Sequence, residues 1–303
     1  MLAVLFGVFV GTVMPIQTSA NSRLRRSVGS PFLASLVSFA VGFLALLLAV
    51  LLIDAHLPPL SQATGMPVWI WSGGILGVVV LTGNIFLFPR LGSVQTVVLP
   101  ITGQVMMGLL IDHLGLFHAP VHRLDAVRVL GALLLVAGVL GTMLRPGQAL
   151  SGGHSSGWSL WAWRAAGVVF GMFSAAQTAI NGQLGVVFGS ALGAALVSFA
   201  FGVVTLLFIN LALRNRWRLD VSAGNPWWMW IGGFLGATFV FGNAFLSPVL
   251  GTGLTVMTIL LGLMAGSLLI DHFGLLGAHR RRVTLLQALG LALMVAGVGV
   301  IRL

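Results

Sequence analysis

The chain has 303 residues, of which 58% are hydrophobic and 7% are charged, whereas soluble domains carry about 25% charged residues. No soluble core could bury so much apolar surface, so the composition excludes a soluble globular protein and predicts an all-α integral membrane protein. The net charge of +10 comes from arginines clustered between apolar runs, which is typical of membrane loops and excludes a nucleic-acid partner. Without cysteine there is no disulfide framework and no thiolate metal site.

Ten apolar stretches are long enough to cross the roughly 30 Å hydrocarbon core of a membrane. The first is not a secretory signal peptide, because its arginines follow the apolar run instead of preceding it. A Gly/Ser-rich connector, 145–164, separates two halves of five stretches each, 1–144 and 165–303. In chain order the predicted helices span 1–20, 31–53, 67–88, 94–111, 126–144, 165–182, 190–213, 227–246, 253–270 and 283–301.

The two halves are copies of one unit. The block from Gln17 to Gly42 returns 160 residues later as Gln177 to Gly202, and Gly108 to Leu116 returns 159 residues later as Ser267 to Leu275. Because five is an odd number of crossings, two copies with the same fold must lie upside down relative to each other. The sequence therefore predicts ten transmembrane helices arranged as two inverted five-helix repeats.

The arginines predict the orientation. Twelve of the fifteen fall in loops on one face, and three (Arg123, Arg128 and Arg302) fall on the other. By the positive-inside rule the face with twelve arginines is cytoplasmic, so both termini are expected outside the cytoplasm.

The second helix of each half carries a face of small residues at a spacing of four. Such faces let helix backbones approach closely in a membrane, where packing drives association. One interpretation is that these faces serve only close helix packing. The alternative is that the helices slide along these smooth faces during transport. The residues are Ala34, Ser38 and Gly42, and again Ala194, Ser198 and Gly202.

Amide side chains recur on one face of the first helix of each half, Gln17 with Asn21 and Gln177 with Asn181. An amide inside a membrane needs a hydrogen-bond partner or a water-lined cavity. One interpretation is that the amides join helices; the other is that both pairs face a shared cavity near the midplane and bind a solute. Asn84 and Asn243, late in the third helix of each half, are predicted additional contacts on that substrate pathway.

An Asp-His pair ends the fourth helix of each half, Asp112–His113 and Asp271–His272. An aspartate beside a histidine can bind or relay a proton near neutral pH, which makes these residues candidates for ion coupling. The pairs can equally act as polar stops where the helix meets water. Both interpretations are kept.

Two patterns that suggest catalysis or metal binding do not fit their context. The G-x-S-x-G motif at 153–157 lies in the connector, without the strand and helix that a nucleophile elbow requires. His113, His118 and His122 lack a recognised metal spacing. We therefore predict no catalytic residue, no metal, no cofactor and no enzymatic activity.

The five-plus-five inverted repeat resembles the drug/metabolite transporter superfamily. The Q-T-x-x-N, A-x-x-x-S-F-x-x-G and L-L-I-D-H-x-G-L blocks resemble its YdcZ-like branch, in which many members have a single five-helix copy, so this chain looks like a fused tandem form. Small multidrug resistance relatives exchange protons through a glutamate in the first helix. This chain has no glutamate and places Gln17 and Gln177 in that helix, which argues against that coupling mechanism and against a permanent cation as substrate.

We expect a secondary transporter in the bacterial inner (plasma) membrane, an exporter by the resemblance, that moves a small neutral or zwitterionic solute by alternating access. Its expected partners are the lipid bilayer and that solute, and a homodimer is left open. The alternative function is a facilitative channel-like permease. An intramembrane enzyme or scaffold is disfavoured, because the helices carry no clustered nucleophile or carboxylate dyad.

Overall fold

The computed structural model describes residues 1–143, 157–216, 224–277, 280 and 282–302. Every regular element in these ranges is helical, which confirms the predicted all-α class. The α-helices are α1 (Leu2–Val28), α2 (Pro31–Ala49), α3 (Gly73–Leu114), α4 (Ala126–Met143), α5 (Gly157–Phe188), α6 (Ala191–Ala212), α7 (Gly232–Leu250), α8 (Thr252–Phe273) and α9 (Leu285–Arg302). Helix α5 begins inside the predicted connector 145–164, and 144–156 lie outside the described residues.

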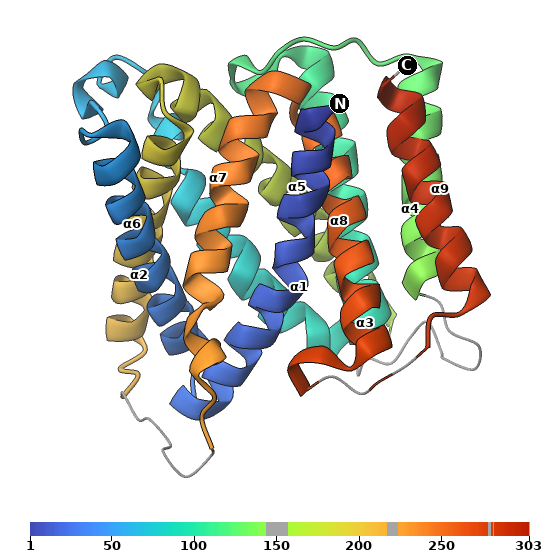
Figure 1. The fold of residues 1–303 in the computed structure, drawn as a ribbon, viewed down its shortest axis with the longest axis horizontal. Helices are drawn as coiled ribbons and strands as arrows, with labels where there is room; N and C mark the ends of the chain where they lie inside the picture. The colour runs from blue at the N-terminus through green and yellow to red at the C-terminus, as the bar shows by residue number, and fades with distance from the viewer. Residues whose placement is uncertain (144–156, 217–223, 278–279, 281, 303) are drawn as a thin grey trace.

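Helix α3 supplies two crossings that the sequence predicts as separate helices over 67–88 and 94–111. Its 42 residues would extend about 63 Å if straight, twice the hydrocarbon thickness. Instead the helix turns back, so that its ends lie on the same side of the molecule (Figure 1). A β-carbon added to Gly167 of α5 would meet Leu99, and one added to Gly171 would meet Pro100, both in the second arm of α3. A β-carbon added to Gly83, in the first arm of α3, would meet Phe170 of α5. Both arms of α3 thus contact one stretch of α5.

The first residues predicted for the third helix of each repeat form a short 3-10 turn instead, Val68–Trp71 and Trp227–Trp230. In the second repeat the third and fourth helices are separated at Gly251, whose φ of 81° and ψ of 161° belong to a region open essentially to glycine alone. In the described residues, seven helical stretches are long and apolar enough to cross a membrane. Counting the two arms of α3 separately, the nine α-helices of these residues form ten helical segments across the bundle.

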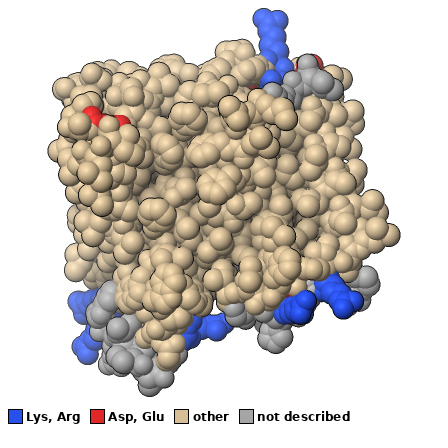
Figure 2. All heavy atoms as spheres, viewed as in Figure 1, with Lys and Arg blue, Asp and Glu red and all other residues tan. Residues whose placement is uncertain are grey.

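The bundle has two distinct ends. The termini end carries both chain termini and lies at the top of Figure 1. The turn that continues α2 and ends at Asp54 finishes there, as does α3, whose last turn contains Asp112. The arginine end lies opposite, and most of the visible arginine side chains gather along that edge in Figure 2. The last turn of α1 there carries Arg25 and Arg26, and Arg214 follows the end of α6.

The two repeats are interlocked and inverted. Phe39 of α2 and its repeat equivalent Phe199 of α6 stack with ring centroids 4.9 Å apart. A β-carbon added to Gly42 would meet Phe199, and one added to Gly202 would meet Phe39. At the opposite edge α4 packs on α9 with the same reciprocity: a β-carbon on Gly138 would meet the Gly290 carbonyl oxygen, and one on its equivalent Gly297 would meet that of Gly131. A pseudo-twofold axis therefore runs across the bundle, perpendicular to the helices, through these two pairs.

Glycine backbones hold the first helix of each repeat against the fourth helix of the other. A β-carbon on Gly11 of α1 would lie 2.1 Å from the Ile259 carbonyl oxygen of α8, and one on Gly171 of α5 would lie 1.9 Å from that of Pro100 in α3. Neither carbonyl can move without its helix. These positions require glycine because the two backbones touch.

The small-residue faces of α2 and α6 lie against the third helix of the opposite repeat. Ser38 and Gly42 contact Gly233 of α7, whose added β-carbon would lie 2.2 Å from the Ser38 carbonyl oxygen. Ser198 and Gly202 contact Gly74 of α3 in the same way, at 2.0 Å from the Ser198 carbonyl oxygen. Ala34 and Ala194 are buried one turn earlier, at 3% and 0% exposure.

Candidate functional site

The amide pair of α1 lies against the first turns of α7. A β-carbon on Gly232 would lie 2.2 Å from Asn21 Oδ1, and one on Gly236 would lie 2.5 Å from Gln17 Nε2. The amides thus occupy the space where side chains of α7 would be. Two polar side chains of the first repeat are held by a glycine surface of the second.

The amide pair of α5 repeats this arrangement with the repeats exchanged. A β-carbon on Gly73 of α3 would lie 2.1 Å from Asn181 Oδ1, and one on Gly77 would lie 2.6 Å from Gln177 Nε2. In this geometry the glycine Cα–H points at the amide oxygen, a weak hydrogen bond that recurs where helices touch. Both amide pairs therefore lie at the seam between the repeats.

The two pairs lie on opposite sides of the middle of the bundle, and the glutamine of the α1 pair approaches it: a β-carbon on Gly236 would lie 2.5 Å from Gln17 Nε2 and 3.7 Å from Phe199, the ring that stacks on Phe39 across the repeats. Gly232 opens α7 at the arginine end, and Gly73 opens α3 at the termini end. Inversion is the reason: the twofold rotation carries a position on one side of the midplane to the same distance on the other side. Gln17 and Gln177 lie one turn closer to the middle than their asparagines.

Three amide oxygens of these pairs are buried without a hydrogen-bond partner among the described residues. They are Gln17 Oε1, Asn21 Oδ1 and Asn181 Oδ1. A buried amide oxygen that loses water costs about 1–3 kcal/mol unless a donor replaces the water. A solute or water that brings N–H or O–H groups would satisfy them.

The predicted contacts in the third helices differ. Asn243 of α7 is 4% exposed; its Oδ1 accepts from Thr178 Oγ1 at 3.0 Å and its Nδ2 donates to the Phe239 carbonyl at 2.9 Å. Its hydrogen-bonding groups are thus engaged within the protein, joining α7 to α5. The side chain of Asn84 lies outside the described residues.

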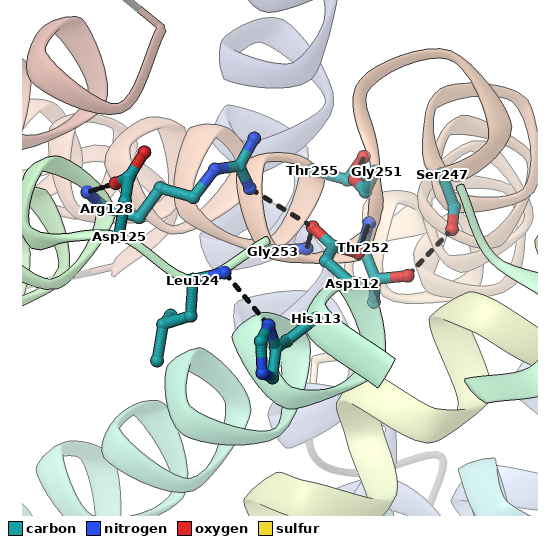
Figure 3. A network of polar contacts seen from close by, with 10 residues as sticks. All are labelled: Asp112, His113, Leu124, Asp125, Arg128, Ser247, Gly251, Thr252, Gly253 and Thr255. Atoms are coloured by element: carbon teal, nitrogen blue, oxygen red, sulfur yellow. Dashed lines mark hydrogen bonds and ion pairs between the residues drawn. The ribbon is translucent and has the colours of Figure 1, made fainter. Parts of the chain in front are cut away.

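Asp112 of α3 caps the start of α8 (Figure 3). Its carboxylate accepts hydrogen bonds from Thr252 N at 2.6 Å and Gly253 N at 2.9 Å. Arg128 Nη1 lies 3.8 Å from Oδ2, and the side chain of Asp112 is completely buried. The free N–H groups at a helix start and the helix dipole both favour a carboxylate there. The contact joins the first repeat to the second.

His113 does not face Asp112. Its Nδ1 accepts from Leu124 N at 3.0 Å (Figure 3), and His272 accepts from Val283 N at 3.4 Å. Leu124 and Val283 are repeat equivalents, so each histidine fixes the loop that follows its own helix. This geometry favours the polar-stop interpretation for the histidines. Asp271 is partly exposed, and the described residues hold no group of three metal-ligating side chains.

One polar contact between the repeats was not predicted from the sequence. Asp54, at the end of the π-helical turn Val50–Asp54 that continues α2, accepts a hydrogen bond from Ser190 Oγ. Ser190 is the N-cap of α6 and also accepts from Gly193 N at 2.8 Å. The sequence does contain a pattern that could have drawn attention to Asp54: the tetrapeptide Leu-Leu-Ile-Asp ends at Asp54 as well as at Asp112 and Asp271.

Comparisons with known proteins identify the family. The family model described as "Putative inner membrane exporter, YdcZ" matches residues 2–141 and 162–300, one match for each repeat. A solved structure described only as "Crystal structure of protein" shares the fold, with a TM-score of 0.72 at 16% identity over 99% of this chain and 95% of that one. A search of curated proteins found no match. The chain therefore belongs to the YdcZ family of inner-membrane exporters within the drug/metabolite transporters, as a multi-pass membrane protein that carries the family's five-helix unit twice.

Proposed function

We propose that this protein exports a small neutral or zwitterionic solute across the inner membrane by alternating access between two conformations. The family is one of inner-membrane exporters, and the inverted repeats supply two related ends that can exchange roles. The observation that carries the solute class is the chemistry of the seam. It holds amides and glycines: the atoms nearest to the β-carbon positions of Gly73, Gly77, Gly232 and Gly236 belong mainly to the four amide side chains, and none belongs to a carboxylate.

The amide pairs are the proposed solute contacts. Gln17 and Asn21 would meet the solute when the arginine end is open, and Gln177 and Asn181 when the termini end is open. Buried oxygens without partners favour a solute that presents hydrogen-bond donors. A permanent cation would need a carboxylate beside it, because amides do not repay the desolvation of a full charge.

The arginine distribution supports an orientation with the arginine end in the cytoplasm and both termini outside. A reporter enzyme that is active only outside the cytoplasm, fused after Leu303, should be active. Activity of a cytoplasm-specific reporter at the same site would contradict this orientation.

The test begins with a thermal-shift screen of metabolites and toxic compounds against the purified protein, run at two pH values. The solutes that stabilise it are then loaded into liposomes containing the protein, and their release is measured. Failure of every candidate to cross, with and without a pH gradient, would overturn the proposal.

Substitutions separate solute binding from helix packing. Gln177→Ala and Asn181→Ala should each weaken solute binding about tenfold, the equivalent of one hydrogen bond of roughly 1.4 kcal/mol, with folded yield unchanged. Gln183→Ala is the matched control, because Gln183 lies on α5 but contacts none of the seam glycines. Loss of folded protein in the first two variants would show that the amides join helices instead.

A carrier and a channel-like permease differ in their kinetics. Alternating access predicts saturable flux and faster exchange when unlabelled solute is present on the far side of the membrane. Flux that rises linearly with concentration, without this acceleration, would favour the permease.

A further inference from the structure

At the termini end, two carboxylates of the first repeat reach helix starts of the second. Asp112 binds the backbone N–H groups of Thr252 and Gly253 at the start of α8. Asp54 binds Ser190, the N-cap of α6. Each contact crosses between the repeats, so the two halves cannot separate at this end while both contacts persist.

The α2–α6 contact differs between the two ends. The residue 160 positions after Asp54 is Arg214, which has no acceptor atom and cannot bind the N-cap of α2 as Asp54 binds that of α6. In the described residues, Asn210 Nδ2 of α6 donates instead to the Phe32 carbonyl of α2 at 3.2 Å. Hydrogen bonds to a charged acceptor are the stronger kind, so this contact is stronger at the termini end than at the arginine end.

Packing follows the same asymmetry. Asn181 and Thr178, at the termini end, are 1% and 7% exposed, whereas Asn21 is partly exposed and Thr18 is exposed at the arginine end. Met257 and Thr258 of α8 are completely buried, and their equivalents Val98 and Leu99 of α3 are partly exposed. The structure is thus closed around α5 and α8 and looser around α1 and the second arm of α3.

We propose that the Asp112 carboxylate is the latch of the gate at the termini end. While it binds the start of α8 the gate stays closed, and transport requires it to leave Thr252 N and Gly253 N. The inference rests on the proposed alternating access. It assigns Asp112 a positioning role: the residue controls which end is open and does not touch the solute.

The groups around Asp112 make the latch sensitive to that one contact. Arg128 from α4 lies 3.8 Å from the carboxylate and His122 precedes α4, its backbone N donating to the Asp112 carbonyl at 2.8 Å. Asp125 is occupied in capping α4 through Arg128 N at 2.8 Å. No other described side chain accepts a hydrogen bond from Thr252 N or Gly253 N, so nothing replaces the carboxylate when it leaves.

The absence of cysteine from the sequence allows a direct test with single-cysteine reporters. Asn181→Cys reports access from the termini side and Asn21→Cys reports access from the arginine side, each measured as the labelling rate by a membrane-impermeant maleimide in sided vesicles. Asp112→Asn keeps the shape but loses the charge and one acceptor. It should raise labelling at residue 181 about tenfold and lower labelling at residue 21 at least twofold.

Opposite changes at the two reporters distinguish gating from loss of structure, which would raise both rates. Asp125→Asn is the matched control: it removes a carboxylate from a helix start at the same end, but within one repeat, and should move neither reporter. If Asp112→Asn fails to fold, Thr252→Pro decides the question, because proline removes the N–H at a helix position that tolerates it. It should raise labelling at residue 181 about threefold.

Unchanged labelling in both Asp112→Asn and Thr252→Pro, or a rise at both reporters, would overturn the latch. The measurement needs no solute, so its failure is separate from failure of the transport proposal. A protein that moves no solute but shows the opposite changes would keep the latch and lose the proposed function.

Discussion

Helix α8 and the second arm of α3 descend from the same repeat unit but lie in different surroundings. Thr255 of α8 is completely buried, and its hydroxyl donates to the Gly251 carbonyl at 2.7 Å. Its equivalent Thr96 lies in a partly exposed stretch, and its hydroxyl oxygen has no hydrogen-bond partner in the described part of the chain.

The difference shows how one sequence unit, used twice in opposite orientation, can build unlike ends. If the copies exchanged surroundings, the loose end would become the tight one. Two packings of one chain related in this way are what alternating access requires. The predictions below concern contacts that are the same at both ends of the bundle and contacts that differ between them.

The largest loss of stability is expected at two glycines that make the same backbone contact in both repeats. Gly11→Val and Gly171→Val both place a side chain against a carbonyl oxygen of another helix, and each should cost more than about 3 kcal/mol of stability. Folded yield in detergent should collapse equally for both. Gly299→Val, where an added β-carbon meets nothing within 4 Å, is the control, and a normal yield from either test variant would contradict the backbone contacts.

A smaller effect should separate the two amide pairs. Gly236→Ala and Gly77→Ala push a methyl group toward the nitrogens of Gln17 and Gln177. In the observed conformation the arginine end is the looser one, so Gly236→Ala should weaken solute binding about tenfold, near 1.4 kcal/mol, and Gly77→Ala less. The measurement is calorimetric titration with the solute found by thermal shift. The reverse order would show that the termini end admits the solute first.

The histidines should behave alike at both ends. His113→Ala and His272→Ala each remove one acceptor for a loop N–H, so each should lower stability by about 1 kcal/mol and leave the pH dependence of transport unchanged. Thermal melting and transport assays at several pH values measure both. Loss of pH dependence in either variant would instead support a proton role for the Asp-His pairs.

The smallest effect concerns the second carboxylate. Asp54→Asn keeps an acceptor for the Ser190 hydroxyl, so it should raise termini-side labelling of Asn181→Cys only about twofold, since a neutral acceptor is weaker than a charged one. Arg214→Asn, the equivalent change at the arginine end, is the matched comparison and should leave this reporter unchanged. An effect of Asp54→Asn larger than that of Asp112→Asn would transfer the latch to Asp54.

Much of the fold follows from the sequence because repetition constrains it. Gln17 to Gly42 and Gln177 to Gly202 fix two copies, the odd number of passes fixes their inversion, and apolar length fixes the passes. The arms of α3 were predicted as separate helices since apolar runs cannot show whether backbone between them stays helical. The Asp54 contact with Ser190 was missed because no local pattern pairs residues 136 positions apart.

The candidate site divides in the same way. The sequence identified the amide pairs and the Asp-His pairs because polar residues are rare in apolar helices and can be recognised there without knowledge of the fold. It could not show that each amide pair lies against glycines of the opposite repeat, since contacts between the repeats are a property of the assembled structure. Nor could it show that Asp112 and His113, neighbours in the chain, bind different backbones.

The sequence alone determined the class, the number of passes, the inversion and the family, because hydrophobic length and repetition are written along the chain. Only the tertiary structure decided which helices of the two repeats pack together, that glycines of one repeat receive the amides of the other, and that Asp112 binds the start of α8. These depend on contacts between the repeats. Two copies of one repeat unit packed against each other acquire different surroundings, and neither copy's sequence shows which one is more deeply buried.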